Sequence, residues 1–191
     1  MKKNEYKNAI RSKKKIASAY LKLLNKHEKF TITDIVDLAE INRGTFYLHF
    51  KNLTDVDRYI EEGLAENFKV LEEDFRQSDL SKTPEIILNK LNVVLLKDLE
   101  FYKLIVHSSE TIHLMKKIEN SIMKSISNNF KIMKYVNNYE RFKIIVEYIV
   151  GGTITSYSEW IKGNIDCDIY TLSANIADLI KKGLVGVLSD N

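Results

Sequence analysis

Apolar residues recur every three or four positions along almost the whole chain, which is the spacing of helices with one buried face. The first three segments of this kind cover about residues 4–26, 32–39 and 43–50. Thr31 and Asn42 stand just before the second and third segments, and their side chains can cap a helix. The spacing therefore predicts three helices in the first quarter of the chain.

The pattern continues in longer segments. Either Asn52 or Thr54 can cap a fourth helix. Residues 77–84 are the clearest linker, and Pro84 suits the first position of the next helix. That helix is apolar on nearly every side, which predicts burial between other helices.

Further helical segments are expected near residues 100–107 and 110–135, and two long helices over about 138–162 and 168–188. In the last of these, the spacing predicts that Leu179 faces inward with its apolar neighbours. One proline and seven glycines are too few for the turns of an all-β fold. The sequence thus predicts an all-α fold of about nine helices.

Composition limits the class of protein. Apolar residues make up 45% and charged residues 29% of the 191 positions, as in globular proteins. No apolar run reaches the roughly 18–20 residues of a membrane span, and the N-terminal MKKNEYKNAI lacks the apolar core of a secretory signal. The single cysteine, Cys167, rules out an internal disulfide framework. A cytoplasmic protein without a membrane partner is expected.

The charge is unevenly distributed. Residues 1–52 carry 12 Lys and Arg against 5 Asp and Glu, a net charge of +7, whereas residues 53–191 carry 17 against 21, a net charge of −4. A basic end on a mildly acidic body favours a polyanionic partner. A solvated lysine-rich helix face would give the same count, so charge alone leaves both interpretations open.

The spacing of the second and third helices adds to the case for nucleic acid. Two short helices separated by a three-residue turn have the geometry of a helix-turn-helix motif, whose second helix enters the major groove of DNA. Arg43 and Thr45 then lie at the front, where Arg can bond guanine and the Thr methyl can touch thymine. Tyr47, His49 and Lys51 are better placed for phosphates.

The string TITDIVDLAEINRGTFYLHFKNLTDV resembles the DNA-binding region of TetR-type (tetracycline-repressor-like) transcriptional regulators. Such regulators have a three-helix head, here residues 1–52, on a larger helical body, here residues 53–191. The resemblance implies double-stranded DNA with a palindromic operator as a partner. The residues expected at DNA are Thr31, Thr33, Asn42, Arg43, Gly44, Thr45, Tyr47, His49 and Lys51.

Three positions depart from the family pattern. Glu40 replaces the usual turn glycine and must adopt the turn conformation less easily. Asn42 replaces the usual capping serine, which is an acceptable exchange. Leu53 replaces the lysine that often meets phosphate at the start of the fourth helix. These departures bear on tight operator binding rather than on the fold.

The resemblance also implies a homodimer formed through the last two helices. Gly151 and Gly152 lie inside the penultimate helix, where each costs roughly 1 kcal/mol relative to Ala, and close approach of another helix would compensate. Packing within one monomer is the alternative. The residues proposed for the interface are Phe142, Ile149, Gly152, Leu172, Ile176, Leu179 and Gly183.

A small-molecule effector is implied in the same way. An apolar and aromatic set in the body can line a pocket, although aromatic residues at helical spacing are also ordinary core. The candidates are Phe101, Tyr102, His107, Met115, Tyr148, Tyr157 and Trp160.

No metal site, cofactor site or enzyme motif is expected, because His107 and His113 do not share a helical face and no partner has ligand spacing. The sequence predicts a dimeric DNA-binding transcriptional regulator, in the first place a repressor released by an effector. The alternative is a ligand-sensing or protein-contacting activator whose body is the main working part.

Overall fold

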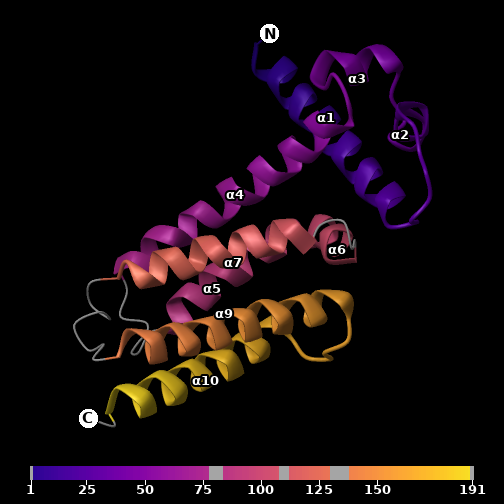
Figure 1. Cartoon of the computed structure of the whole chain (residues 1–191). Helices are drawn as coiled ribbons and strands as arrows, with labels where there is room; N and C mark the ends of the chain where they lie inside the picture. Colours follow the sequence, from indigo (N-terminus) through magenta and orange to yellow (C-terminus); the bar gives the residue numbers. More distant parts are fainter. Residues whose placement is uncertain (1, 78–83, 108–111, 130–137, 190–191) are drawn as a thin grey trace.

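The computed structural model describes residues 2–77, 84–107, 112–129 and 138–189, and within these ranges all regular structure is helical. The predicted all-α fold is confirmed (Figure 1). The helices are α1 (Lys2–Leu24), α2 (Ile32–Leu38), α3 (Arg43–His49), α4 (Leu53–Gln77), α5 (Pro84–Lys97), α6 (Leu99–His107), α7 (Ile112–Ser127), α9 (Tyr139–Lys162) and α10 (Ile169–Ser189).

The first three helices form a head at the N-terminal end of the molecule, where α1 also contacts α6 of the body (Figure 1). Helices α2 and α3 pack on α1, and the side chains of Ile16, Leu21, Ile35 and Phe46 between them are almost completely buried. Phe46 therefore faces inward from α3. Burial of this apolar face is what holds such short helices, because seven residues alone do not form a stable helix in water.

Side-chain caps set the helix boundaries. Thr31 and Asn42 cap α2 and α3 as predicted. Asn52, rather than Thr54, caps α4, since its Oδ1 accepts a hydrogen bond from the Asp55 amide at 3.0 Å. At the other end of the chain, Gly163 ends α9 in the left-handed conformation with φ of 85°.

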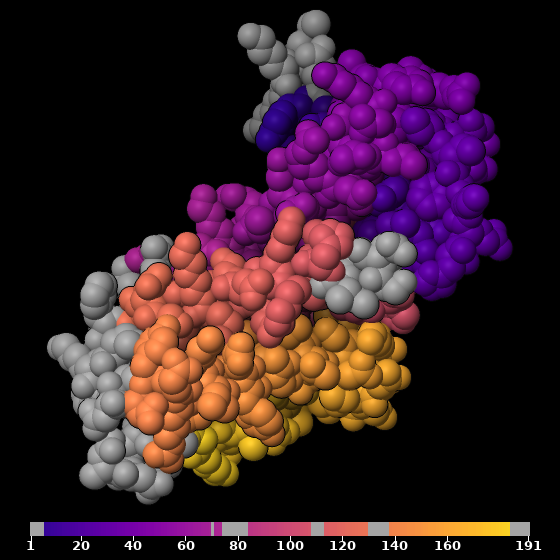
Figure 2. All heavy atoms as spheres, in the orientation of Figure 1, coloured from indigo at the N-terminus to yellow at the C-terminus, as the bar shows by residue number. Residues whose placement is uncertain are grey.

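Helix α4 connects the head to the body. Its first turns complete the head: Val56 and Ile60 are buried, and the rings of Phe50 and Tyr59 meet edge to face with centroids 5.6 Å apart. Farther along, α4 packs against α7 and α5 of the body. Figure 2 shows the resulting two lobes, with α4 passing from one to the other.

The body is a bundle in which α5 packs most extensively on α10, and α9 lies against α6, α7 and α10. The expectation that α5 is covered on nearly every side is wrong, because Ile86, Val93 and Leu96 are exposed. Leu179 of α10 is also exposed, at 70%, which corrects its predicted inward position. Apolar periodicity located the helices but overestimated how completely their neighbours cover them.

Two polar contacts join α1 of the head to the region of α6. The Asn25 side-chain amide, just after α1, donates to the Leu104 carbonyl at 3.0 Å. Lys14 forms an ion pair with Asp98 at 2.6 Å. The position of the head on the body is therefore linked to the position of α6.

Candidate nucleic-acid interface and internal cavity

Arg43 begins α3 and is exposed, with its Nη2 donating a hydrogen bond to the Thr33 hydroxyl at 2.9 Å. Thr33 lies in α2, so this bond ties the two helices of the motif together at the surface. A guanidinium has five N–H donors, and one bond to Thr33 leaves several for another acceptor. Arg43 is thus held outward at the leading end of α3, as the sequence predicts.

Asn42 and its neighbours form a compact cap. The Asn42 Oδ1 accepts from the Thr45 amide at 2.7 Å and from the Thr45 hydroxyl at 3.0 Å. A Cβ added to Gly44 would lie 3.2 Å from the same oxygen, so glycine keeps this cap uncrowded. The Thr45 hydroxyl proton is engaged in this cap, so the groups of this half-buried residue that remain are its methyl group and the lone pairs of its oxygen.

The hydrogen-bonding groups of Thr31 are also engaged within the chain. Its amide and its hydroxyl each donate to Asp34 Oδ2 at 2.7 Å, and together these residues form a capping box at α2. The hydroxyl bond, and then the amide bond, lower the pKa of Asp34. A phosphate at Thr31 would lie beside this carboxylate, so Thr31 serves mainly as the cap of α2.

The far end of α3 carries Tyr47, His49 and, just beyond it, Lys51. Tyr47 and Lys51 are exposed and His49 is half-buried. Burial, followed by the positive charge of Lys13, lowers the pKa of His49, so the imidazole is neutral near pH 7. His49 can then donate a hydrogen bond to a phosphate without carrying a charge.

The structure explains two departures from the family pattern. Glu40 has a φ of 53°, in the left-handed region that glycine occupies without strain. Leu53 is partly buried against the core that includes the head. At position 53 the chain therefore has an apolar packing contact where a lysine would reach toward phosphate.

Leu48 was not among the predicted residues, although it is 77% exposed beside Tyr47. A signal for it existed: the buried residues Phe46 and Phe50 mark the inner face of α3, and a residue midway between them must face outward. An exposed leucine on this helix is suited to contact a thymine methyl.

The predicted interface residues divide into two groups. Phe142, Leu172 and Ile176 are buried in the chain's own core, whereas Ile149 is partly buried and lines the body cavity. Gly152, Leu179 and Gly183 are exposed. Tyr139, Ile144 and Tyr148 of α9 are exposed as well, Tyr148 at 83%.

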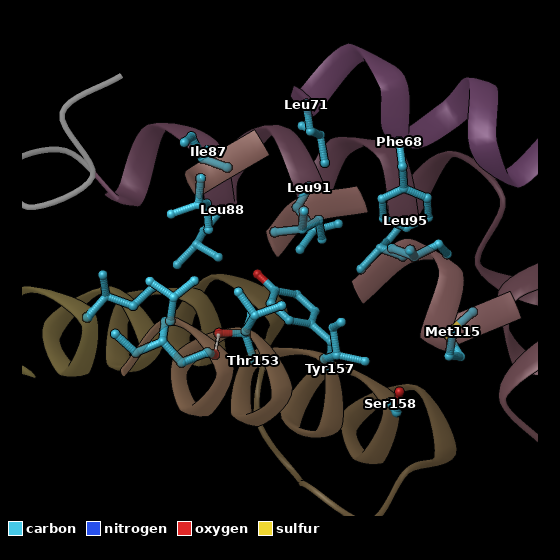
Figure 3. Close-up of a pocket in the computed structure, with 18 of the residues that line it drawn as sticks. Phe68, Leu71, Ile87, Leu88, Leu91, Leu95, Met115, Thr153, Tyr157 and Ser158 are labelled. Carbon is cyan, nitrogen blue, oxygen red and sulfur yellow. Dashed lines mark hydrogen bonds between the residues drawn. The ribbon is translucent and has the colours of Figure 1, made fainter. Parts of the chain in front are cut away.

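The cavity lies in the body and has a volume of about 120 Å³. Side chains from α4, α5, α6, α7, α9 and α10 line it (Figure 3).

Three of the seven predicted pocket residues, Tyr102, Met115 and Tyr157, line the cavity. The other four do not. Phe101 packs against the main core, and Tyr148 lies on the surface. The His107 Nδ1 is 2.7 Å from the Lys103 carbonyl, on the exterior. The Trp160 indole donates to the Cys167 carbonyl at 2.7 Å, which fixes the loop after α9.

A chain of buried polar groups crosses the body beside the cavity. The Tyr157 hydroxyl donates to Asn92 Oδ1 at 2.7 Å, and the Asn92 amide donates to Ser173 Oγ at 3.0 Å. Ser173 in turn donates to the Tyr170 carbonyl at 3.0 Å. Burial raises the pKa of Tyr157 far above the ordinary value of a phenol, so it is a neutral donor here.

Within the described ranges, no three His, Cys, Asp or Glu residues are grouped as metal ligands. Over the same residues, every helix is too short or too polar to cross a bilayer.

A helix-turn-helix head with an exposed arginine, carried on a helical body, is the architecture of a transcription regulator. Residues 82–182 match the family described as transcriptional regulator C-terminal region, TetR_C_8. The match spans more than half of the chain, so the chain belongs to the TetR family of transcriptional regulators. This membership points to a transcription factor rather than an enzyme. No curated protein and no solved structure matched the chain in the corresponding comparisons.

Proposed function

We propose that this regulator binds operator DNA as a homodimer in the cytoplasm and is a repressor that a small molecule releases. The observation that carries the proposal is the outward position of Arg43, held by Thr33 at the leading end of α3. Such a helix fits the major groove, where an arginine can bond guanine O6 and N7 together.

In this arrangement the head, residues 1–52, contacts DNA, and residues 53–191 form the body. Arg43 and Thr45 face base edges, and Leu48 adds an apolar contact. Thr33, Tyr47, His49 and Lys51 lie near phosphates, which fix the register without specifying sequence. Asn42 and Gly44 act through the cap that positions the first turn of α3.

For the dimer, the exposed face of α9 and α10 is the proposed contact. Ile144, Tyr148 and Gly152 follow one another at a spacing of four residues on α9, and Leu179 and Gly183 do the same on α10. Pairing of two bodies through this face would hold two heads at a fixed separation. Heads one helical turn apart, about 34–36 Å, require a palindromic operator.

Release by an effector has a physical route through α6. Tyr102 and Val106 of α6 line the cavity, while the Leu104 carbonyl of the same helix accepts the bond from Asn25 next to the head. A ligand that favours one position of α6 would therefore favour one position of the head. Its affinity and that of DNA would be coupled reciprocally.

The test is selection of duplexes from a random-sequence pool, followed by binding measurements at two salt concentrations. An enriched palindrome and a steep loss of affinity with salt are expected. Arg43→Ala should relax preference at one base position, and Tyr47→Phe should weaken binding to all sequences. Recovery of no palindrome, with affinity independent of salt, would contradict DNA recognition by this head.

A second candidate is an activator whose body contacts a partner protein. The strained Glu40 and the apolar Leu53 favour it, because both depart from a head optimised for DNA. Capture of a partner in the presence and absence of DNA separates the two candidates: an activator retains its partner without DNA.

A further inference from the structure

We infer that the ligand of the body cavity is an uncharged, apolar molecule about the size of a single small ring. This inference rests on the proposed effector site and specifies its chemistry. Three features carry it: the composition of the wall, the engagement of the wall's hydroxyl groups, and the size of the cavity.

The wall is formed by aliphatic and aromatic side chains, and the surface that faces the cavity is apolar. Among the described lining residues there is no Asp, Glu, Lys, Arg or His. Figure 3 shows Leu88, Leu91 and Leu95 of α5 on the side of the cavity opposite Thr153 and Tyr157 of α9. An ionised ligand would be buried here without a partner for its charge, which is strongly unfavourable.

The hydroxyl groups of the wall are mostly used within the chain. The Thr153 hydroxyl donates to the Ile149 carbonyl at 2.7 Å, and the Tyr157 hydroxyl donates to Asn92 at 2.7 Å. Two more lining residues have a hydroxyl: Tyr102, whose oxygen accepts a hydrogen bond from the Asn67 side-chain amide at 3.2 Å, and Ser158, which lies at one end of the group drawn in Figure 3. A ligand with several polar groups would leave most of them unpaired, so an apolar ligand is preferred.

The volume limits the ligand to a compact molecule. The cavity measures about 120 Å³, somewhat below an engineered apolar cavity of roughly 150 Å³ that binds benzene. A single aromatic ring with a short substituent, or an aliphatic molecule of similar bulk, is the class that fits with little adjustment of the wall.

The test uses the full chain without DNA and four probes that share one ring: toluene, benzyl alcohol, benzoate and benzylamine. Binding is followed by calorimetry and by shifts of methyl NMR signals. Toluene is expected to bind, benzyl alcohol about tenfold more weakly, and the two ions at least about 100-fold more weakly, because polar and charged groups lose hydration in the cavity.

A matched pair of substitutions locates the binding. Val150→Phe fills the cavity and should weaken toluene binding at least about tenfold, because an overfilled site excludes the ligand. Val93→Phe makes the same change on the exposed face of α5 and should leave binding unchanged. Val150→Leu adds a smaller group and gives an intermediate loss, which serves if the Phe variant does not fold.

Three results would overturn the inference: benzoate or benzylamine binding as tightly as toluene, toluene binding that is insensitive to both Val150 variants, or no toluene binding up to its aqueous solubility. DNA release is measured in a separate experiment with the selected operator. Toluene binding without any release would support the ligand class and count against the proposed repressor mechanism alone.

Discussion

The head and the body are both helical, but their polar contacts differ in range. In the head, Thr31 bonds Asp34 and Asn42 bonds Thr45, each across three residues of sequence. In the body, Asn92 reaches Tyr157 across 65 residues and Ser173 across 81. Both regions have an apolar core and local caps, such as Asn138 with Arg141 in the body. Among the described residues, only the body adds this buried polar chain, which forms when distant helices pack.

The head and the body also differ in how their side chains are packed. In the head, the core residues Ile16 and Phe46 are fully buried, and the outward-facing Arg43 is held by Thr33. The body has an apolar cavity beside its polar chain. Under the proposed function, a side chain that is already held in place suits a specific contact with DNA, and a cavity suits a response to a ligand.

The largest expected effect is on the long-range contacts of the body. Asn92→Ala removes the acceptor of the Tyr157 hydroxyl and leaves a small cavity, so the free energy of unfolding should fall by about 3 kcal/mol. For a chain of this length that lowers the thermal midpoint by roughly 6–12 °C. Circular dichroism melting measures it.

Asn89→Ala is the matched control, since Asn89 is exposed on the same helix. It should change the midpoint by no more than about 2 °C. If the two variants had the same thermal midpoint, the polar chain of the body would contribute little to stability. The long-range polar contacts would then not distinguish the body from the head.

The same contrast explains how far the sequence could predict the molecule. The helix starts at Thr31 and Asn42 were predicted because each depends on a local signal, a capping side chain within a few residues. Arg43 was placed outward for the same reason. The buried bond between Asn92 and Ser173 has no local signal, so nothing in the sequence near either residue indicated it.

The pocket residues show what a better prediction required. Tyr148 and Tyr157 lie nine residues apart, about 2.5 turns, so they face opposite sides of α9 and could not both line one cavity. Periodicity alone could therefore have separated them. Periodicity could not have separated Leu172 from Leu179, because they lie about two turns apart on one side of α10. Leu172 is buried and Leu179 is exposed, since the neighbouring helices cover only part of that side.

A local contact of the head should have a smaller effect. Asn42→Ala removes the cap of α3 and should lower the free energy of unfolding by about 1 kcal/mol, while also weakening DNA binding because the first turn of α3 frays. Chemical denaturation and operator titration measure the two effects. Asn42→Asp keeps an acceptor at the same place and should preserve most of the stability; an equal loss in both variants would mean that the cap is not what Asn42 contributes.

The smallest expected effect is an increase in the free energy of unfolding, from a substitution in the turn between α2 and α3. Glu40→Gly relieves a left-handed backbone that costs a residue with a Cβ about 1–2 kcal/mol, and the greater freedom of glycine in the unfolded chain offsets part of this. A net increase of about 0.5–1 kcal/mol in the free energy of unfolding is expected. The ion pair with Lys15, at 4.0 Å and well exposed, contributes little to oppose this increase.

Glu40→Gln is the control, because it removes the same charge but keeps the strained backbone, so it should leave stability unchanged. A similar increase in stability from Glu40→Gln would mean that the cost lies in the charge of Glu40 rather than in its conformation.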